Sequence, residues 1–113
     1  MRYHNFYSDR FGPDHATISV PRIADYMDKA RDALGVTSDR QLSKFLPACN
    51  AAINQWRTGR TWPSDVNMIA LADLAQCDTA QALVALNFWR SPQTVRPIYE
   101  RMFSKLLAEN KAA

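Results

Sequence analysis

The sequence predicts an all-α fold of five or six helices, preceded by an irregular arm over residues 1–19. Along most of the chain, apolar residues recur at spacings of three and four, which is the period of one helical face. Two of the three glycines, Gly35 and Gly59, fall where such patterns stop, and a left-handed helix cap favours glycine there. Only residues 16–20, ATISV, alternate in the manner of a strand. A chain of 113 residues is expected to form one core, so residues 20–113 are taken as one domain.

The first two helices are expected on either side of Gly35. Pro21 suits the opening turn of the first, because its fixed φ is helical. Four apolar residues then make one stripe, namely Ile23, Met27, Ala30 and Leu34. Ser38 begins the second helix, because Ser38 and Gln41 have the spacing of a capping box, and Pro47 interrupts it. Its apolar residues are Leu42, Phe45 and Leu46.

A third helix is expected from about Cys49 to Thr58, with the sequence NAAINQWRT after the cysteine. Its inner face holds Ala52, Ile53 and Trp56, and its outer face is rich in amides. The apolar residues expected to hold the second and third helices together are Leu42, Phe45, Ile53 and Trp56.

Three further helices complete the expected fold. Ser64 caps the fourth, and Asp78 or Thr79 caps the fifth. The last extends from about Thr94 to Glu109, with its start delayed by a proline in its first turn. Apolar residues of all three are expected to face the core; they are Val66, Ile69, Ala70, Ala72, Leu74, Leu83, Leu86, Phe88, Ile98, Met102, Phe103, Leu106 and Leu107.

Residues of catalytic or metal-binding type are sparse and scattered. Cys49 and Cys77 lack CxxC spacing and are interpreted as small buried hydrophobes, and His4 and His15 have no third ligand nearby. No nucleophile motif or phosphate-binding glycine loop is present, so we expect no enzyme, no metal, no cofactor and no small-molecule substrate. No stretch approaches the roughly 18 apolar residues of a membrane span, and no signal peptide is recognisable. The prediction is a cytoplasmic protein without a membrane partner.

The net charge of +3 is small, but it is unevenly distributed. Residues 38–62 hold four basic residues against one acidic residue, and residues 90–113 hold five against two. Residues 63–89 between them hold three aspartates and no basic residue, which is typical of a solvated face. Two basic segments therefore flank an acidic one.

A short helix, a turn of about three residues and a second short helix form the unit that places a helix in the DNA major groove. Asn and Gln can bond bidentately to adenine, Arg can do so to guanine, and an alanine can contact a thymine methyl. The predicted base-reading residues are Asn50, Ala51, Asn54, Gln55 and Arg57. The predicted phosphate-contacting residues are Arg40, Lys44, Thr58, Arg60 and Trp62. An ordinary solvated helix face remains the alternative for the first set, and packing on the fourth helix remains the alternative for Trp62.

Residues 42–59, LSKFLPACNAAINQWRTG, resemble without a gap the helix-turn-helix of the lambda-repressor/Cro-like (XRE-type) family. Leu42 stands where that family opens the packed face of the first motif helix. Ile53 and Trp56 occupy its second-helix anchor positions, and Gly59 its closing glycine. DKARDALGVTSDRQLSKFL and ALVALNFWRSPQTVRPIYERMFSKL are most similar to a small phage-related group of such domains. The resemblance implies sequence-specific binding to double-stranded DNA.

Two positions depart from the family pattern. Pro47 stands where a turn glycine is common, and proline cannot adopt a positive φ, so the turn must differ locally. Cys49 stands where a Ser or Thr usually caps the recognition helix, which weakens that cap. Asn50 is the alternative cap, if the helix starts one residue later.

The function expected from these residues is transcriptional regulation by a phage or prophage repressor that reads an operator with residues 49–58. A homodimer is expected, because one recognition helix reads only a few base pairs and two-fold pairing places a second one about 34 Å away. Either the arm or the C-terminal helix could form the dimer contact. The alternative function is that of a phage accessory protein that uses the same fold to bind a protein partner.

Overall fold

The computed structural model describes residues 20–112. Within these residues the chain forms six helices and no strand. The all-α prediction is therefore confirmed. The helices are α2 (Ile23–Leu34), α3 (Asp39–Ser43), α4 (Asn50–Thr58), α5 (Asp65–Leu74), α6 (Thr79–Arg90) and α7 (Arg96–Ala112). The predicted arm, with His4 and His15, lies outside the described residues. None of the six helices has the length and apolar composition needed to cross a bilayer.

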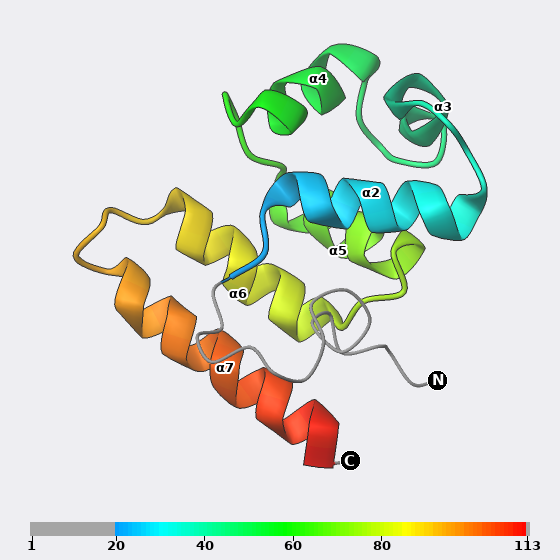
Figure 1. Cartoon of the computed structure of the whole chain (residues 1–113). Helices are drawn as coiled ribbons and strands as arrows, with labels where there is room; N and C mark the ends of the chain where they lie inside the picture. The colour runs from blue at the N-terminus through cyan, green and yellow to red at the C-terminus, as the bar shows by residue number, and fades with distance from the viewer. Residues whose placement is uncertain (1–19, 113) are drawn as a thin grey trace.

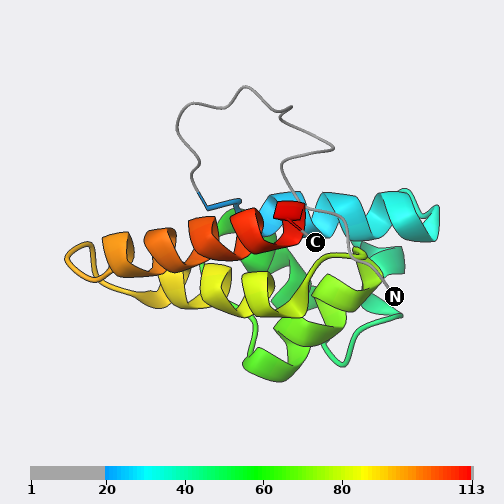
Figure 2. The ribbon, with the colours of Figure 1, turned by 90° about the horizontal axis from the view of Figure 1, so that it is seen from below.

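Helix α2 runs through the middle of the molecule, with α3 and α4 on one side of it (Figure 1). Helices α6 and α7 form an antiparallel pair at the opposite end, and both views show them side by side (Figures 1 and 2). Helix α5 contacts both α2 and α6, and so connects the two ends. This arrangement places α4 far from α7.

Several of the expected helix caps are formed by the expected residues. Gly35 and Gly59 adopt φ values of 71° and 76°, and each cap amide bonds carbonyls of the preceding turn. The Ser38 and Ser64 hydroxyls accept backbone N–H bonds at 3.1 and 3.2 Å. Asp78, rather than Thr79, caps α6. These local signals lie within four residues of the groups they bond, which is why the sequence alone revealed them.

The interior is formed by one apolar cluster that draws on every helix. Tyr26 and Met27 of α2 are fully buried, as is Phe103 of α7. At the junction of α2 and α6, the Trp89 indole N–H donates to the Pro21 carbonyl at 2.9 Å, and Tyr26 meets the Trp89 ring edge-on. The beginning of α2 is thereby held on α6.

Several residues that the sequence places in the core are exposed instead. Within α3 and its following turn, Leu42 and Leu46 occupy inward positions four residues apart, which leaves Phe45 53% exposed. Elsewhere the sequence over-counts because only one face of a helix meets the core and some apolar residues lie outside that face. The exposed ones are Val66 and Ile69 of α5, and Ile98 and Met102 of α7. Of the two cysteines expected to be buried, Cys77 is buried and Cys49 is exposed.

Candidate nucleic-acid interface

Helix α4 exposes one continuous stripe of polar and small side chains. Asn50, Ala51, Asn54, Gln55 and Thr58 are all exposed. Their spacing of one, three, one and three residues confines them to less than half of the helix circumference, since each residue turns about 100°. Four of the five predicted base-reading residues thus share this surface, which we call the amide face. Two of its side chains make hydrogen bonds within the protein: the Gln55 side-chain carbonyl accepts one from the Thr61 hydroxyl at 3.2 Å, and the Thr58 hydroxyl bonds backbone carbonyls of α4 itself.

The opposite side of α4 is anchored in the core. Ile53 is fully buried and Trp56 is 3% exposed, three residues further along the same side. Leu42 of α3 is also fully buried, and α3 and α4 contact each other as well as α2. The predicted core role of these three residues is confirmed. Because the anchors point inward, the amide face must point outward.

The connection between α3 and α4 differs from the predicted turn of about three residues. Helix α3 ends at Ser43, so the connection comprises residues 44–49. Cys49 remains the N-cap of α4 and makes no side-chain capping bond. Asn50 is therefore the first helical residue rather than the cap, and its amide stays on the amide face.

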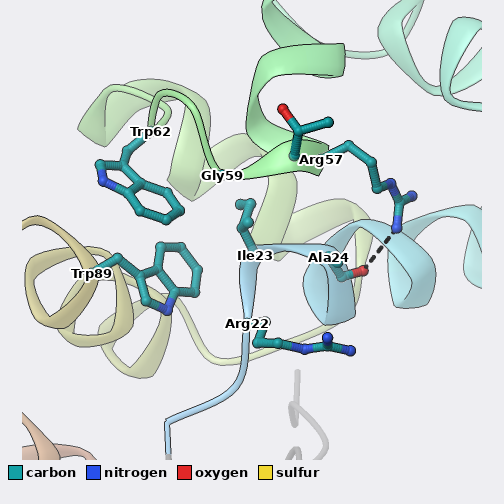
Figure 3. Close-up of a pocket in the computed structure, with 8 residues that line it drawn as sticks. Arg22, Ile23, Ala24, Arg57, Gly59, Trp62 and Trp89 are labelled. Atoms are coloured by element: carbon teal, nitrogen blue, oxygen red, sulfur yellow. Dashed lines mark hydrogen bonds between the residues drawn. The ribbon is translucent and has the colours of Figure 1, made fainter.

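Arg57 is the predicted base-reading residue that the structure places elsewhere. Its guanidinium is turned toward α2 and α3, and only 27% of the side chain is exposed. It donates to both carboxylate oxygens of Asp39, at 2.7 and 3.0 Å, and to Asp28 at 2.8 Å. A further bond reaches the Ala24 carbonyl at 3.4 Å, as the dashed line in Figure 3 shows. The structure therefore does not place the Arg57 guanidinium with the other predicted base-reading side chains, because its donors already bond Asp39, Asp28 and the Ala24 carbonyl.

The ion pair between Arg57 and Asp39 shifts the pKa of both side chains. The Arg57 guanidinium, through its hydrogen bond above all, holds the pKa of the Asp39 carboxyl below its usual value. The hydrogen bond with Asp39 likewise raises the pKa of Arg57. Arg31 adds a second cation 3.2 Å from Asp39. The pair is therefore fully charged at neutral pH.

The three other predicted basic contacts lie at the surface around α4. Arg40 and Lys44 are exposed in α3 and just after it, and Arg60 is exposed one residue past the Gly59 cap. Within residues 20–112, none of the three forms an ion pair with a carboxylate. Arg60 and three residues of the amide face line one surface hollow; the three are Asn54, Gln55 and Thr58. Uncompensated cations beside a neutral polar helix face are suited to phosphates that flank exposed base edges.

Trp62 and Thr58 make contacts of their own within the protein. The Trp62 ring stacks on Trp89 of α6, with ring centroids 5.6 Å apart, so the ring packs within the protein and its aromatic partner belongs to α6. Figure 3 shows the two rings together beside Ile23 and Gly59. All four residues line an apolar cavity of about 250 Å³. The Thr58 hydroxyl bonds carbonyls of the preceding turn. Trp62 thus serves first to hold the segment after α4 against α6.

The residues that the sequence analysis missed are Asp28 and Asp39. Asp39 lies 18 residues and Asp28 lies 29 residues from Arg57 along the chain. Rules for helical neighbours reach only three or four residues, so no local pattern could have paired them. The only available signal was the acidic residue directly before Arg40 in an otherwise basic segment.

The amide face and the cations around it offer hydrogen-bonding groups and positive charge. No group of three or more His, Cys, Asp or Glu side chains within the described ranges could hold a metal ion. Comparisons with protein-family models, with curated proteins and with solved structures return no match to this chain. The residues of the chain itself are therefore the basis on which a function can be proposed.

Proposed function

We propose that this chain binds double-stranded DNA sequence-specifically by inserting the amide face of α4 into the major groove, and that it thereby represses transcription. The observation that carries the proposal is that α4 has one buried apolar side and one exposed polar side. Ile53 and Trp56 anchor one side, and the side chains that can bond base edges project from the other. Exposed amides presented on a helix that is rigidly backed meet the geometric requirement of direct readout.

The surrounding charges support the same proposal. Arg40, Lys44 and Arg60 can each approach a phosphate on either side of the groove that receives α4. The proposed complex contains two copies of the chain, because a single short helix contacts too few base pairs to define an operator. The resemblance of residues 42–59 to phage repressor motifs supports a phage or prophage promoter as the target.

One observation favours a second function, protein binding. Ile98 and Met102 are 49% and 44% exposed on α7 and line a hollow with Arg101 and Lys105. An exposed apolar pair at this spacing is suited to a partner helix. A phage accessory protein that binds another protein through α7 would use this surface and leave the amide face empty.

The salt dependence of duplex binding separates the two functions. Duplexes are first selected from a random pool, and the affinity for the best one is then measured by fluorescence anisotropy at 50 and 200 mM salt. Three phosphate contacts predict a fall of roughly 40-fold and six predict roughly 2,000-fold. Lys44→Ala and Arg60→Ala should each reduce the slope of log affinity against log salt by about 0.9. Lys105→Ala on α7 is the matched control and should leave the slope unchanged.

Two outcomes would contradict the proposal. One is recovery of no enriched sequence from the pool, and the other is duplex binding that changes less than about threefold over this salt range. A palindromic consensus would in addition support two copies per site.

A further inference from the structure

The Arg57 guanidinium joins three helices at one point. Two parallel bonds connect it to Asp39 at the start of α3, and two more connect it to Asp28 and to the Ala24 carbonyl in α2. We call Arg57, Asp39, Asp28 and the Ala24 carbonyl the Arg57 clamp. A guanidinium is a rigid planar fork, so bidentate bonding fixes direction as well as distance. The last turn of α4 is thereby fixed relative to both helices beneath it.

The apolar anchors of α4 leave the rotation and tilt of the helix less well fixed than its depth, and the Arg57 clamp restricts both. Ile53 and Trp56 lie on a single side of the helix, three residues apart, so they fix its depth better than its rotation or tilt. Arg57 lies at the edge between the buried side and the amide face, where a contact resists rotation most directly. Functional groups must be held within about 0.5 Å and 10–20° of their productive geometry.

We propose that Arg57 is a positioning residue, which acts through the Arg57 clamp to set the orientation at which α4 presents its amide face to DNA. This inference rests on the proposed function and names a determinant of its specificity. Arg57 touches neither base nor phosphate in this assignment. Its two carboxylate partners hold its charge inside the protein, so base selection is left to the amide face.

The decisive test uses Asp39→Asn and Arg57→Met, because direct contact and positioning predict opposite results for the first variant. If Arg57 positions α4, both variants reduce affinity for the selected duplex by about tenfold or more and change affinity for random duplex less than twofold. If Arg57 contacts DNA directly, Asp39→Asn frees the guanidinium and removes a negative charge near phosphates. Affinity for both duplexes then stays constant or rises, which would overturn the proposal.

The double variant and a conservative variant sharpen the result. Because the clamp acts as a unit, Asp39→Asn combined with Arg57→Met should lose no more than about twofold beyond the worse single variant. Arg57→Lys keeps a cation that can pair with one carboxylate, and should restore part of the lost affinity. Full additivity would show that the two residues act independently. The control is an interhelical pair that does not involve Asp39, namely Arg90 of α6 and Asp65 of α5 at 2.6 Å, whose variants Arg90→Met and Asp65→Asn should leave duplex discrimination intact.

Hydrogen exchange of the unbound protein separates failure of this inference from failure of the proposed function. Loss of the clamp should accelerate amide exchange in α4 by about tenfold, while α6 and α7 keep their protection. If the wild type binds no duplex but the exchange result holds, the proposed function fails and the clamp stands. Unchanged α4 exchange in folded variants would overturn the clamp. Should Arg57→Met fail to fold, Asp28→Asn provides a milder test, because the Asp28 side chain is 42% exposed.

Discussion

Helices α3 and α4 lie in one of the two basic segments and α7 lies in the other, yet they expose different chemistry. In the first, Arg57 is compensated inside the fold, so a neutral amide face is left between flanking cations. In the second, the exposed cations Arg101 and Lys105 surround two apolar side chains of α7. Basic content alone therefore does not distinguish a nucleic-acid surface from a protein surface. The side chains between the cations do.

The two regions also differ in how they are held. Helix α7 is secured by Phe103 and Leu107, which are 0% and 2% exposed, against the length of α6. The five-residue helix α3 buries only Leu42, and α4 combines two apolar anchors with an ion pair. The α3–α4 unit thus depends on polar contacts for its orientation, which makes it the more sensitive of the two to charge-changing substitutions.

The largest expected effect is a loss of stability in the α6–α7 pair, which is compared with a matched substitution in the α3–α4 unit. Phe103→Ala should lower the free energy of unfolding by about 3–5 kcal/mol, because it leaves a cavity under α7. Phe45→Ala, in the turn after α3, removes a side chain that is 53% exposed and should change stability by less than about 1 kcal/mol. Urea unfolding followed by circular dichroism measures both. Equal losses would contradict the exposed placement of Phe45.

The second expected effect concerns recognition. Asn54→Ala or Gln55→Ala should each weaken binding to the selected duplex by about 1–3 kcal/mol and leave binding to random duplex nearly unchanged. The matched control is Gln93→Ala, which removes an exposed amide from the connection between α6 and α7. Anisotropy titrations on both duplexes give the comparison. Equal losses on the two duplexes would show that these amides do not read bases.

The smallest expected effect is a pH dependence of stability. Because the folded pKa of Asp39 lies below the ordinary aspartate value of 3.8, its ion pair stabilises the fold above that pH. The contribution is lost as the pH falls through the lowered folded pKa. Wild type should exceed Asp39→Asn by about 1 kcal/mol at pH 7, the scale of partly exposed ion pairs, and the difference should shrink below pH 4. Urea unfolding at pH 7, 4.5 and 3 measures it, and a constant difference would assign the effect to something other than charge.

Much of the candidate interface could be predicted from the spacing of residues along the chain. The positions of Asn50, Asn54 and Gln55 follow from helical periodicity once Ile53 and Trp56 are recognised as the buried side. The six helices and their glycine and serine caps follow in the same way. Phe45 and Val66 were misplaced because periodicity ranks residues by type and cannot tell which of two apolar neighbours finds space in the core.

What the sequence by itself determined is the set of helices, their glycine and serine caps and the polar side of α4, because each depends on groups within about four residues of one another. Only the tertiary structure decided which partners the Arg57 and Trp62 side chains contact. Asp28 and Asp39 reach Arg57, and Trp89 reaches Trp62, only after helices distant in the chain have packed. A long polar or aromatic side chain at the edge of a buried face can turn either way, and the neighbours brought by folding determine its direction.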